Sequence, residues 1–149
     1  MEKNVNADYI SVLNEKGVLS FVPAGNSMWP FIKNRKQTVI VKKSDGLFNQ
    51  NDVVFFRRQD GSCVLHRVLQ VFPDYLVVRG DSQINSEKVQ KENVFGILEG
   101  FYKGEKYISV TDEKYQKKVT RWCKNSFFTR LRKKIFYFRN RVKNHFKRG

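Results

Sequence analysis

The sequence predicts a mainly β protein: a compact, barrel-like core with a short N-terminal helix and a basic, amphipathic helical tail. Short runs of β-branched and aromatic residues, separated by turn residues, fill residues 18–110 and are typical of an all-β core. Charge divides the chain, because residues 114–149 hold 14 of the 29 Lys and Arg and no Asp or Glu. The preceding residues hold the other 15 basic residues and all 14 acidic residues, so they are nearly neutral. We therefore expect a β domain at 1–111 and a distinct tail at 112–149.

Apolar side chains recur at helical spacing from Val5 to Leu13, and Gly17 follows where such a helix would end. This pattern predicts a helix over residues 5–15. Strands are expected at residues 18–22, 38–41, 52–58, 63–72, 75–79, 94–102 and 106–110. The Asp60-Gly61 pair predicts a hairpin turn between the third and fourth strands, and residues 80–87 are expected to form a polar loop.

The segment Gly25-Asn26-Ser27-Met28-Trp29-Pro30 places a serine on a corner between the first two strands. Gly25 allows a tight backbone path, and Pro30 fixes its own φ and restricts Trp29, which together hold Ser27 on a stiff turn. Met28 and Trp29 add apolar surface beside the hydroxyl. We therefore identify Gly25, Met28, Trp29 and Pro30 as candidate substrate-binding residues. An ordinary turn is the alternative, because Gly, Asn, Ser and Pro are common in turns.

A serine hydroxyl needs a base within hydrogen-bond reach before it can act as a nucleophile. His66 is the candidate base, because an imidazole with a pKa of about 6.5 suits proton transfer. The other histidine, His145, lies in the tail. Asp81, in the loop after the fifth strand, is the candidate acceptor for the imidazole N–H and would stabilise the protonated ring. The alternatives are a packed histidine and an aspartate in a solvated turn.

Four blocks of sequence occur in the order seen in one superfamily of serine peptidases. They are Gly25-Asn26-Ser27-Met28-Trp29-Pro30, Asp52-Val53-Val54-Phe55-Phe56, Val64-Leu65-His66-Arg67-Val68 and Arg79-Gly80-Asp81. Through these blocks the chain resembles the signal peptidases and self-cleaving repressors from Leu19 to Val110. The histidine block is similar to that of the archaeal and endoplasmic-reticulum signal peptidases, whereas the bacterial enzymes and the repressors use a lysine. The resemblance implies the barrel-like catalytic core of that superfamily.

The resemblance also implies a serine endopeptidase that cleaves a leader or precursor peptide through an acyl-enzyme. Ser27 corresponds to the nucleophile, His66 to the general base and Asp81 to the aspartate after the glycine of the family pattern. Glu87 is the nearest candidate for a second acidic position. Gly25 stands where the membrane enzymes carry an oxyanion-binding serine, so the oxyanion hole would rely on backbone N–H groups such as that of Ser27. A peptide substrate would dock as an added strand near this serine.

The tail carries one apolar row at spacings of three and four residues, with Lys and Arg on the remaining surface. The row consists of Phe127, Leu131, Ile135, Phe138, Val142 and Phe146. Three interpretations stay open: a helix in an anionic membrane interface, a helix packed on the barrel, and contact with nucleic acid. The membrane interface is favoured because aromatic and aliphatic side chains dominate the row. The alternative function is therefore a non-catalytic β scaffold whose basic tail (residues 114–149) binds membrane or nucleic acid.

The sequence predicts no metal site and no cofactor, because Cys63 and Cys123 are the only cysteines and form no CxxC pattern. The first residues carry charges of both signs and no apolar run, so no signal peptide is predicted. The longest uncharged stretch, residues 17–32, is too short and too polar to span a bilayer. We therefore expect a cytoplasmic protein that acts on a peptide or protein and associates peripherally, if at all, with the inner face of the membrane.

Overall fold

The computed structural model describes the backbone of residues 5–124 and 126–146 and the side chains of residues 8–124 and 134–144. Three α-helices flank the strands in this part of the chain: α1 (Val5–Lys16), α2 (Glu113–Lys124) and α3 (Ser126–Phe146). The strands are β1 (Val18–Phe21), β2 (Val39–Lys43), β3 (Val53–Arg57), β4 (Cys63–Val71), β5 (Tyr75–Arg79), β6 (Glu87–Gln90), β7 (Val94–Lys103) and β8 (Lys106–Ser109), with a 3₁₀ turn η1 (Lys91–Asn93) before β7.

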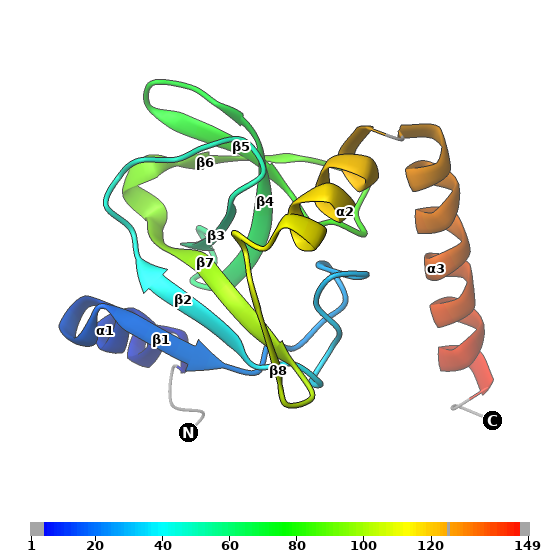
Figure 1. Cartoon of the computed structure of the whole chain (residues 1–149), viewed down its shortest axis with the longest axis horizontal. Coiled ribbons are helices and arrows are strands. Elements are labelled where there is room, and N and C mark those ends of the chain that lie inside the picture. Colours follow the sequence, from blue (N-terminus) through cyan, green and yellow to red (C-terminus); the bar gives the residue numbers. More distant parts are fainter. Residues whose placement is uncertain (1–4, 125, 147–149) are drawn as a thin grey trace.

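All eight described strands belong to one antiparallel sheet, which is not closed (Figure 1). The strand order is β1-β2-β7-β3-β4-β5-β6, and β8 pairs with β7 beside this path. The predicted mainly β class and the predicted N-terminal helix are confirmed. The Asp60-Gly61 turn also forms as predicted, with φ of 86° at Gly61 and a 2.8 Å hydrogen bond from Arg58 N to Ser62 O.

The strand β6 was not predicted, because the sequence of Glu87–Gln90 lacks the usual strand signal. Only Val89 of its four residues is buried, and the strand pairs with β5 alone at the edge of the sheet. Pairing with a neighbour, rather than intrinsic preference, therefore makes this segment a strand. Glu87, expected at the end of a loop, is consequently fixed in the sheet.

Helix α1 packs against the strands at one end of the sheet. Leu13 is fully buried and Ile10 nearly so, in one cluster with residues of β2, β3 and β7. The helix approaches closely because Gly96 of β7 has no side chain: a Cβ there would lie 2.9 Å from Leu13 Cδ2 and 2.4 Å from Val41 Cγ1. Gly17 ends the helix with φ of 75°, and its N–H donates to Leu13 O at 2.9 Å.

The central strands β3 and β4 are buried on both faces. One apolar cluster contains Phe55 and Leu65, and a second contains Val54, Phe56 and Val68. Neighbouring residues of a strand point to opposite faces, which explains how adjacent side chains enter different clusters. The same alternation places His66 and Arg67 of β4 on opposite faces, so their side chains reach two different environments.

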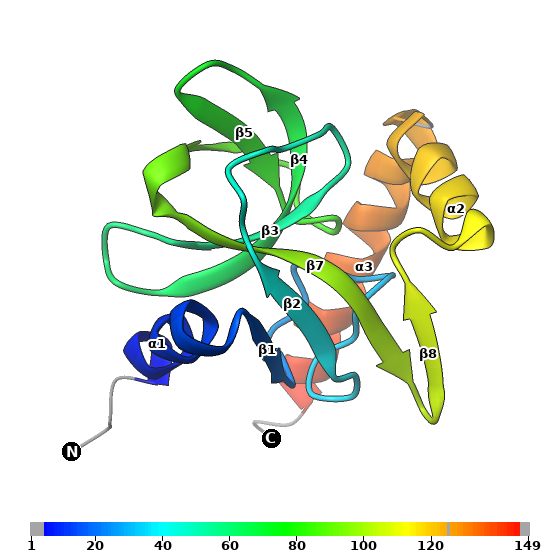
Figure 2. The same ribbon diagram turned by 60° about the vertical axis from the view of Figure 1, so that its left-hand side comes forward.

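The helix α2 belongs to the core, although it follows the boundary predicted at residue 112. Tyr115, Val119 and Trp122, spaced four and three residues apart, are its buried face. Asp112 caps the helix, because its Oδ1 accepts the Tyr115 N–H at 3.0 Å. Figure 2 shows the hairpin of β7 and β8 leading into α2, and in Figure 1 α3 stands at the opposite end of the molecule from α1.

Candidate functional site

Ser27 lies in the irregular segment between β1 and β2. Gly25 has φ of 98°, in the region that favours glycine, so the tight path expected there is found. Its N–H donates to Asn34 Oδ1 at 2.7 Å, and Trp29 N donates to Asn26 O at 3.1 Å. Two bonds therefore fix the chain on either side of Ser27.

The loop after β5 holds the backbone of the Ser27 segment through hydrogen bonds. Ser82 N donates to Ser27 O at 2.9 Å, and Ser82 Oγ donates to Asn26 O at 2.7 Å. Gly80 is in such close contact that a Cβ at this position would lie 2.7 Å from Ser27 O. The first and last of the sequence blocks that carry the peptidase resemblance are therefore in direct contact.

Arg67 anchors this loop through Asp81. Its Nε donates to Asp81 Oδ1 at 2.7 Å and its Nη2 to Asp81 Oδ2 at 2.8 Å, with both side chains nearly completely buried. The guanidinium also donates to Asn51 O at 2.8 Å and to the Tyr115 hydroxyl at 3.3 Å. Trp122 Nε1 donates to Asp81 O at 3.1 Å, so α2 also holds the loop. Both carboxylate oxygens of Asp81 thus accept hydrogen bonds from Arg67. The predicted hydrogen bond from His66 to Asp81 is not found among the described residues.

His66 meets Glu87 instead. The ring is 1% exposed, and its Nδ1 lies 3.0 Å from Glu87 Oε1. That distance suits an ion pair or a hydrogen bond, but the two groups are not aligned, and neither ring nitrogen has a well-aligned hydrogen-bond partner among the described residues. Glu87 is held by Arg58, whose Nη2 and Nε donate to its two oxygens at 2.6 and 3.1 Å. A buried, incompletely bonded imidazole requires an explanation, because most such groups are satisfied.

The electrostatic environment keeps His66 neutral. Burial lowers the pKa of the imidazole from 6.5 to about 4, an effect that the nearby Glu87 carboxylate opposes and Arg58 assists. Burial raises the pKa of Glu87, but the hydrogen bond and charge of Arg58 outweigh it, so this pKa lies below its ordinary value. At neutral pH the pair therefore consists of a neutral imidazole and a charged carboxylate. The imidazole is unprotonated, as a general base must be, but its pKa of about 4 makes it a weaker base than a free imidazole.

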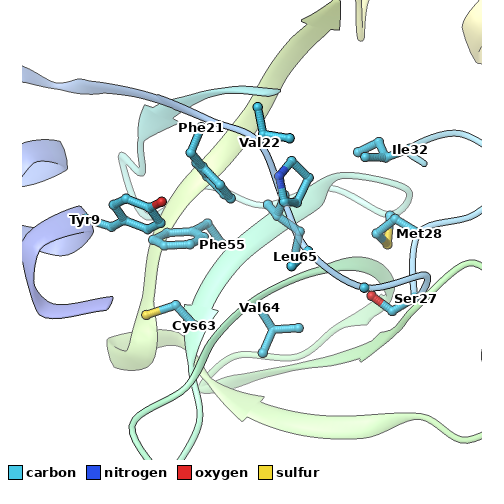
Figure 3. A pocket seen from close by; sticks show the side chains of 13 residues that line it. Tyr9, Phe21, Val22, Ser27, Met28, Ile32, Phe55, Cys63, Val64 and Leu65 are labelled. Atoms are coloured by element: carbon cyan, nitrogen blue, oxygen red, sulfur yellow. The ribbon is translucent and has the colours of Figure 1, made fainter. Parts of the chain in front are cut away.

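A pocket of about 250 Å³ lies beside Ser27. Its lining comes from α1, β1, the Ser27 segment, β3 and β4: Tyr9, Phe21, Val22, Pro23, Ala24, Gly25, Ser27, Met28, Ile32, Phe55, Cys63, Val64 and Leu65. Figure 3 shows Ser27 and Met28 at one end and Tyr9, Phe21 and Phe55 at the other. Of the candidate substrate-binding residues, Gly25 and Met28 line the pocket, whereas Trp29 and Pro30 are not among the lining residues.

Trp29 points toward the C-terminal helices. Its ring stacks on Phe136 of α3 with centroids 4.5 Å apart and an interplanar angle of 18°, and it meets Trp122 of α2 edge-on at 6.1 Å. Met28 and Trp29, both expected beside the serine hydroxyl, thus point to different parts of the protein. Met28 faces the pocket, and Trp29 joins the Ser27 segment to the tail.

His66 follows pocket-lining residues of β4, but its side chain lies on the face opposite most of them. Val64 lines the pocket and shares its face of the strand with His66, whereas Cys63 and Leu65 lie on the other face with Phe55. Among the described residues Ser27 Oγ and His66 share no hydrogen bond. Ser27 and the residues that precede His66 nevertheless border the same cavity, and the loop carrying Asp81 contacts the Ser27 backbone.

Two strand edges that have no neighbouring strand on one side in the described sheet border the pocket. The first half of β4 pairs with β3 only, because its pairing with β5 begins at Arg67. In the described sheet β1 pairs with β2 only. Residues after β1 and residues 63–65 of β4 line the pocket from its two sides. Free edges of this kind can accept an extended peptide as an added strand.

Sequence reasoning missed Arg67 as the partner of Asp81 and Ser82 as the donor to the Ser27 segment. One signal for Arg67 was present: it stands beside His66 among apolar residues of a strand, so at least one of the two was expected to be buried, and a buried arginine needs an acid as its partner. The contact of Ser82 had no signal, because it depends on two loops that only the sheet brings together.

No family model and no curated protein matches the chain. The resemblance to signal peptidases therefore stays an expectation that depends on its four sequence blocks. Within residues 5–124 and 126–146, no group of three or more His, Cys, Asp or Glu side chains could hold a metal ion. In the same part of the chain, no helix combines the length and the apolar character needed to cross a membrane.

Proposed function

We propose that this protein is a serine endopeptidase of signal-peptidase type, with a catalytic core like that of the superfamily it resembles. Ser27 is the nucleophile, His66 the general base and Glu87 the carboxylate that stabilises the protonated imidazole. One observation carries the proposal: a buried, neutral imidazole lacks well-aligned hydrogen bonds, stands beside a charged carboxylate and follows strand residues that line a pocket with Ser27. A satisfied structural histidine would have its nitrogens bonded.

The substrate is a leader or precursor peptide that binds in extended form between residues 21–25 and 63–66. Backbone bonds to β1 and to Val64 and Leu65 of β4 would supply affinity, and one side chain would enter the largely apolar pocket beside Met28. Cys63 does not compete as the nucleophile, because burial raises the pKa of its thiol and keeps it protonated near neutral pH.

Cleavage would proceed through an acyl-enzyme. His66 takes the Ser27 hydroxyl proton as Oγ attacks the scissile carbonyl, and the imidazolium then gives that proton to the leaving amine as the C–N bond breaks. The Ser27 N–H, which has no acceptor among the described residues, is the proposed donor to the oxyanion. A water molecule, deprotonated by His66, hydrolyses the ester and returns Ser27 to its starting state.

Asp81, predicted to orient the histidine, acts in this proposal through the backbone. Its pairing with Arg67 fixes the loop that donates to Asn26 O and Ser27 O. Asp81 is therefore a positioning residue for the nucleophile, and Glu87 takes the role next to the imidazole. In this proposal the two acidic residues implied by the resemblance, Asp81 and Glu87, therefore have different roles.

The proposal is tested with the full chain and a library of peptides, in which new termini are identified by mass spectrometry. Ser27→Ala should abolish cleavage and leave the melting temperature unchanged, because this side chain makes no hydrogen bond among the described residues. Ser20→Ala, at an exposed position of β1, is the matched control and should cleave at the wild-type rate. The same fragments produced at the same rate by the Ser27→Ala protein would end the proposal.

The alternative is a non-catalytic scaffold, which the exposed apolar row of α3 favours. A deletion that separates the two functions must spare α2, because Tyr115 and Trp122 are part of the core. Truncation after Lys124 is therefore the appropriate variant. If this truncation removed the cellular function of the protein and Ser27→Ala left that function intact, the scaffold would be the better account.

A further inference from the structure

Helix α3 exposes a row of large apolar side chains. Ile135, Phe138 and Val142 are 51%, 68% and 37% exposed and are spaced three and four residues apart, on one side of the helix. Phe127, Leu131 and Phe146, which the sequence places on the same row, lie outside the described side chains. Contiguous exposed apolar rows are uncommon on protein surfaces unless another molecule covers them.

A different side of α3 contacts the rest of the protein. Phe136 stacks on Trp29, and Asn140, four residues later, is half-buried on the same side. With 3.6 residues per turn, this side lies largely opposite the row of Ile135, Phe138 and Val142. One interpretation of the sequence was that the row packs α3 on the β core. The described part of the row does not do so.

Basic side chains border the row on both sides. Lys134 and Arg141, seven residues apart, lie along one border, and Arg139 and Lys143, four residues apart, lie along the other. All four are exposed, and residues 114–149 contain no acid to neutralise them. An apolar stripe with cations at its margins fits a surface that is apolar inside and negatively charged at its boundary.

We propose that α3 binds the surface of an anionic lipid bilayer, with Ile135, Phe138 and Val142 entering the headgroup region and the bordering cations contacting phosphate. A second copy of the chain fits less well, because two such helices would bring like charges together without any acid to pair with them. Nucleic acid would use the cations but would leave the apolar row in water.

Bilayer binding would hold the Ser27 segment about one helix diameter from the lipid surface, because the exposed row lies on the side of α3 opposite Phe136. Trp29, which contacts α3 through Phe136, is two residues from Ser27, so the bound helix and the Ser27 segment are in direct contact. If the proposed function is correct, the substrates are peptides held at or near a membrane. The lipid interaction itself does not depend on the peptidase assignment.

The test uses the full chain in co-sedimentation with vesicles of phosphatidylcholine, with or without about 30% phosphatidylglycerol. We expect binding to the anionic vesicles, weak binding to the neutral ones, and a loss of affinity of about tenfold or more in an Ile135→Ser, Phe138→Ser variant. Leu47→Ser removes an apolar side chain that is 73% exposed on a loop of the β domain, and this control should bind as the wild type does.

Three results would overturn the inference. The first is equal binding to both kinds of vesicle, and the second is unchanged binding in the doubly substituted variant. The third is binding to a DNA or RNA duplex that ignores the substitutions, with no vesicle binding. The Ser27→Ala protein should bind vesicles as the wild type does, so failure of the peptidase proposal and failure of the lipid proposal are distinguishable.

Discussion

His66 and Arg67 are neighbours on β4, are each 1% exposed, and nevertheless have opposite surroundings. Arg67 bonds to Asp81, Asn51 and Tyr115 and lies over the ring of Phe31 at 5.2 Å. His66 faces Glu87 at 3.0 Å without alignment and lies edge-on to Phe56 at 5.7 Å. One buried polar side chain is fully bonded, and the other is not.

This difference separates a structural role from a chemical one. A fully bonded buried ion pair contributes to a fixed geometry, and here Arg67 fixes the loop beneath Ser27. An imidazole that lacks aligned bonds does little for stability, but it is free to accept and donate a proton. The following predictions test whether the two neighbours differ in this way.

The largest effect on stability is expected from Arg67→Met. The substitution leaves the Asp81 carboxylate buried without its partner and should cost about 3–5 kcal/mol in the free energy of unfolding. His66→Leu removes two unsatisfied nitrogens and should change that free energy by less than about 1 kcal/mol in either direction. Chemical denaturation measures both.

Arg57→Met, at an exposed position of β3, is the control for the loss of a cation and should cost less than about 1 kcal/mol. If His66→Leu destabilised the protein as much as Arg67→Met does, the contrast between the two residues would be wrong.

The next effect is a dependence of stability on pH. The folded-state pKa of His66, about 4, lies below its value of 6.5 in the unfolded chain, so the unfolded state binds the proton first. Stability should therefore fall as the pH decreases from about 6.5 to about 4, by a total on the order of 3 kcal/mol. The His66→Leu protein should lack this part of the loss. Superimposable stability curves for the two proteins over that range would contradict the assignment.

Gly80→Ala tests the contact between the loop after β5 and the backbone of Ser27, the proposed nucleophile. The new Cβ would lie 2.7 Å from Ser27 O, and a backbone atom cannot move aside without moving Ser27. Because small displacements of a reacting group are costly, we expect a loss in kcat of about 10²-fold. The circular dichroism spectrum should be preserved. Wild-type kcat in this variant would show that the position of the Ser27 segment is not critical.

The smallest effect is expected from Ser82→Ala. It removes the bond from Ser82 Oγ to Asn26 O but keeps the backbone bond from Ser82 N to Ser27 O. Stability should fall by about 1 kcal/mol, and kcat should fall less than in Gly80→Ala. Ser62→Ala removes a hydroxyl that, among the described residues, bonds to Asp60 in an exposed turn, and is the control. A larger loss of kcat in Ser82→Ala than in Gly80→Ala would reverse the proposed order.

The sequence was sufficient for elements whose residues carry their own signal. The strands β3 and β4 are strongly apolar, and the turn at Gly61 depends on one glycine, so both were predictable. The strand β6 was not, because it exists through pairing with β5. The helix α2 had a signal in the spacing of Tyr115, Val119 and Trp122. Because its other residues share the dense positive charge of the tail, the sequence prediction placed it in the tail and not in the core.

The sequence singled out segments that meet in the structure, but it did not predict which of their side chains pair. The blocks containing Ser27, His66 and Asp81 meet or border one cavity, and Glu87 was already noted as a further acid. Which acid faces which base depends on the alternation along β4 and on the register of β5 with β6. Sequence spacing contains neither, so the partner of His66 could be identified only from the structure.

The most direct test of the central claim is to trap the acyl-enzyme. The peptide-library reaction is quenched with acid, and the fragment that contains Ser27 is examined by mass spectrometry. We expect a peptide acyl group on Ser27 in the wild type, and a rate of acylation lower by about 10²–10⁴-fold in the His66→Leu protein. Acylation of another residue, or equal rates of acylation of Ser27 in the two proteins, would contradict the claim that His66 activates Ser27.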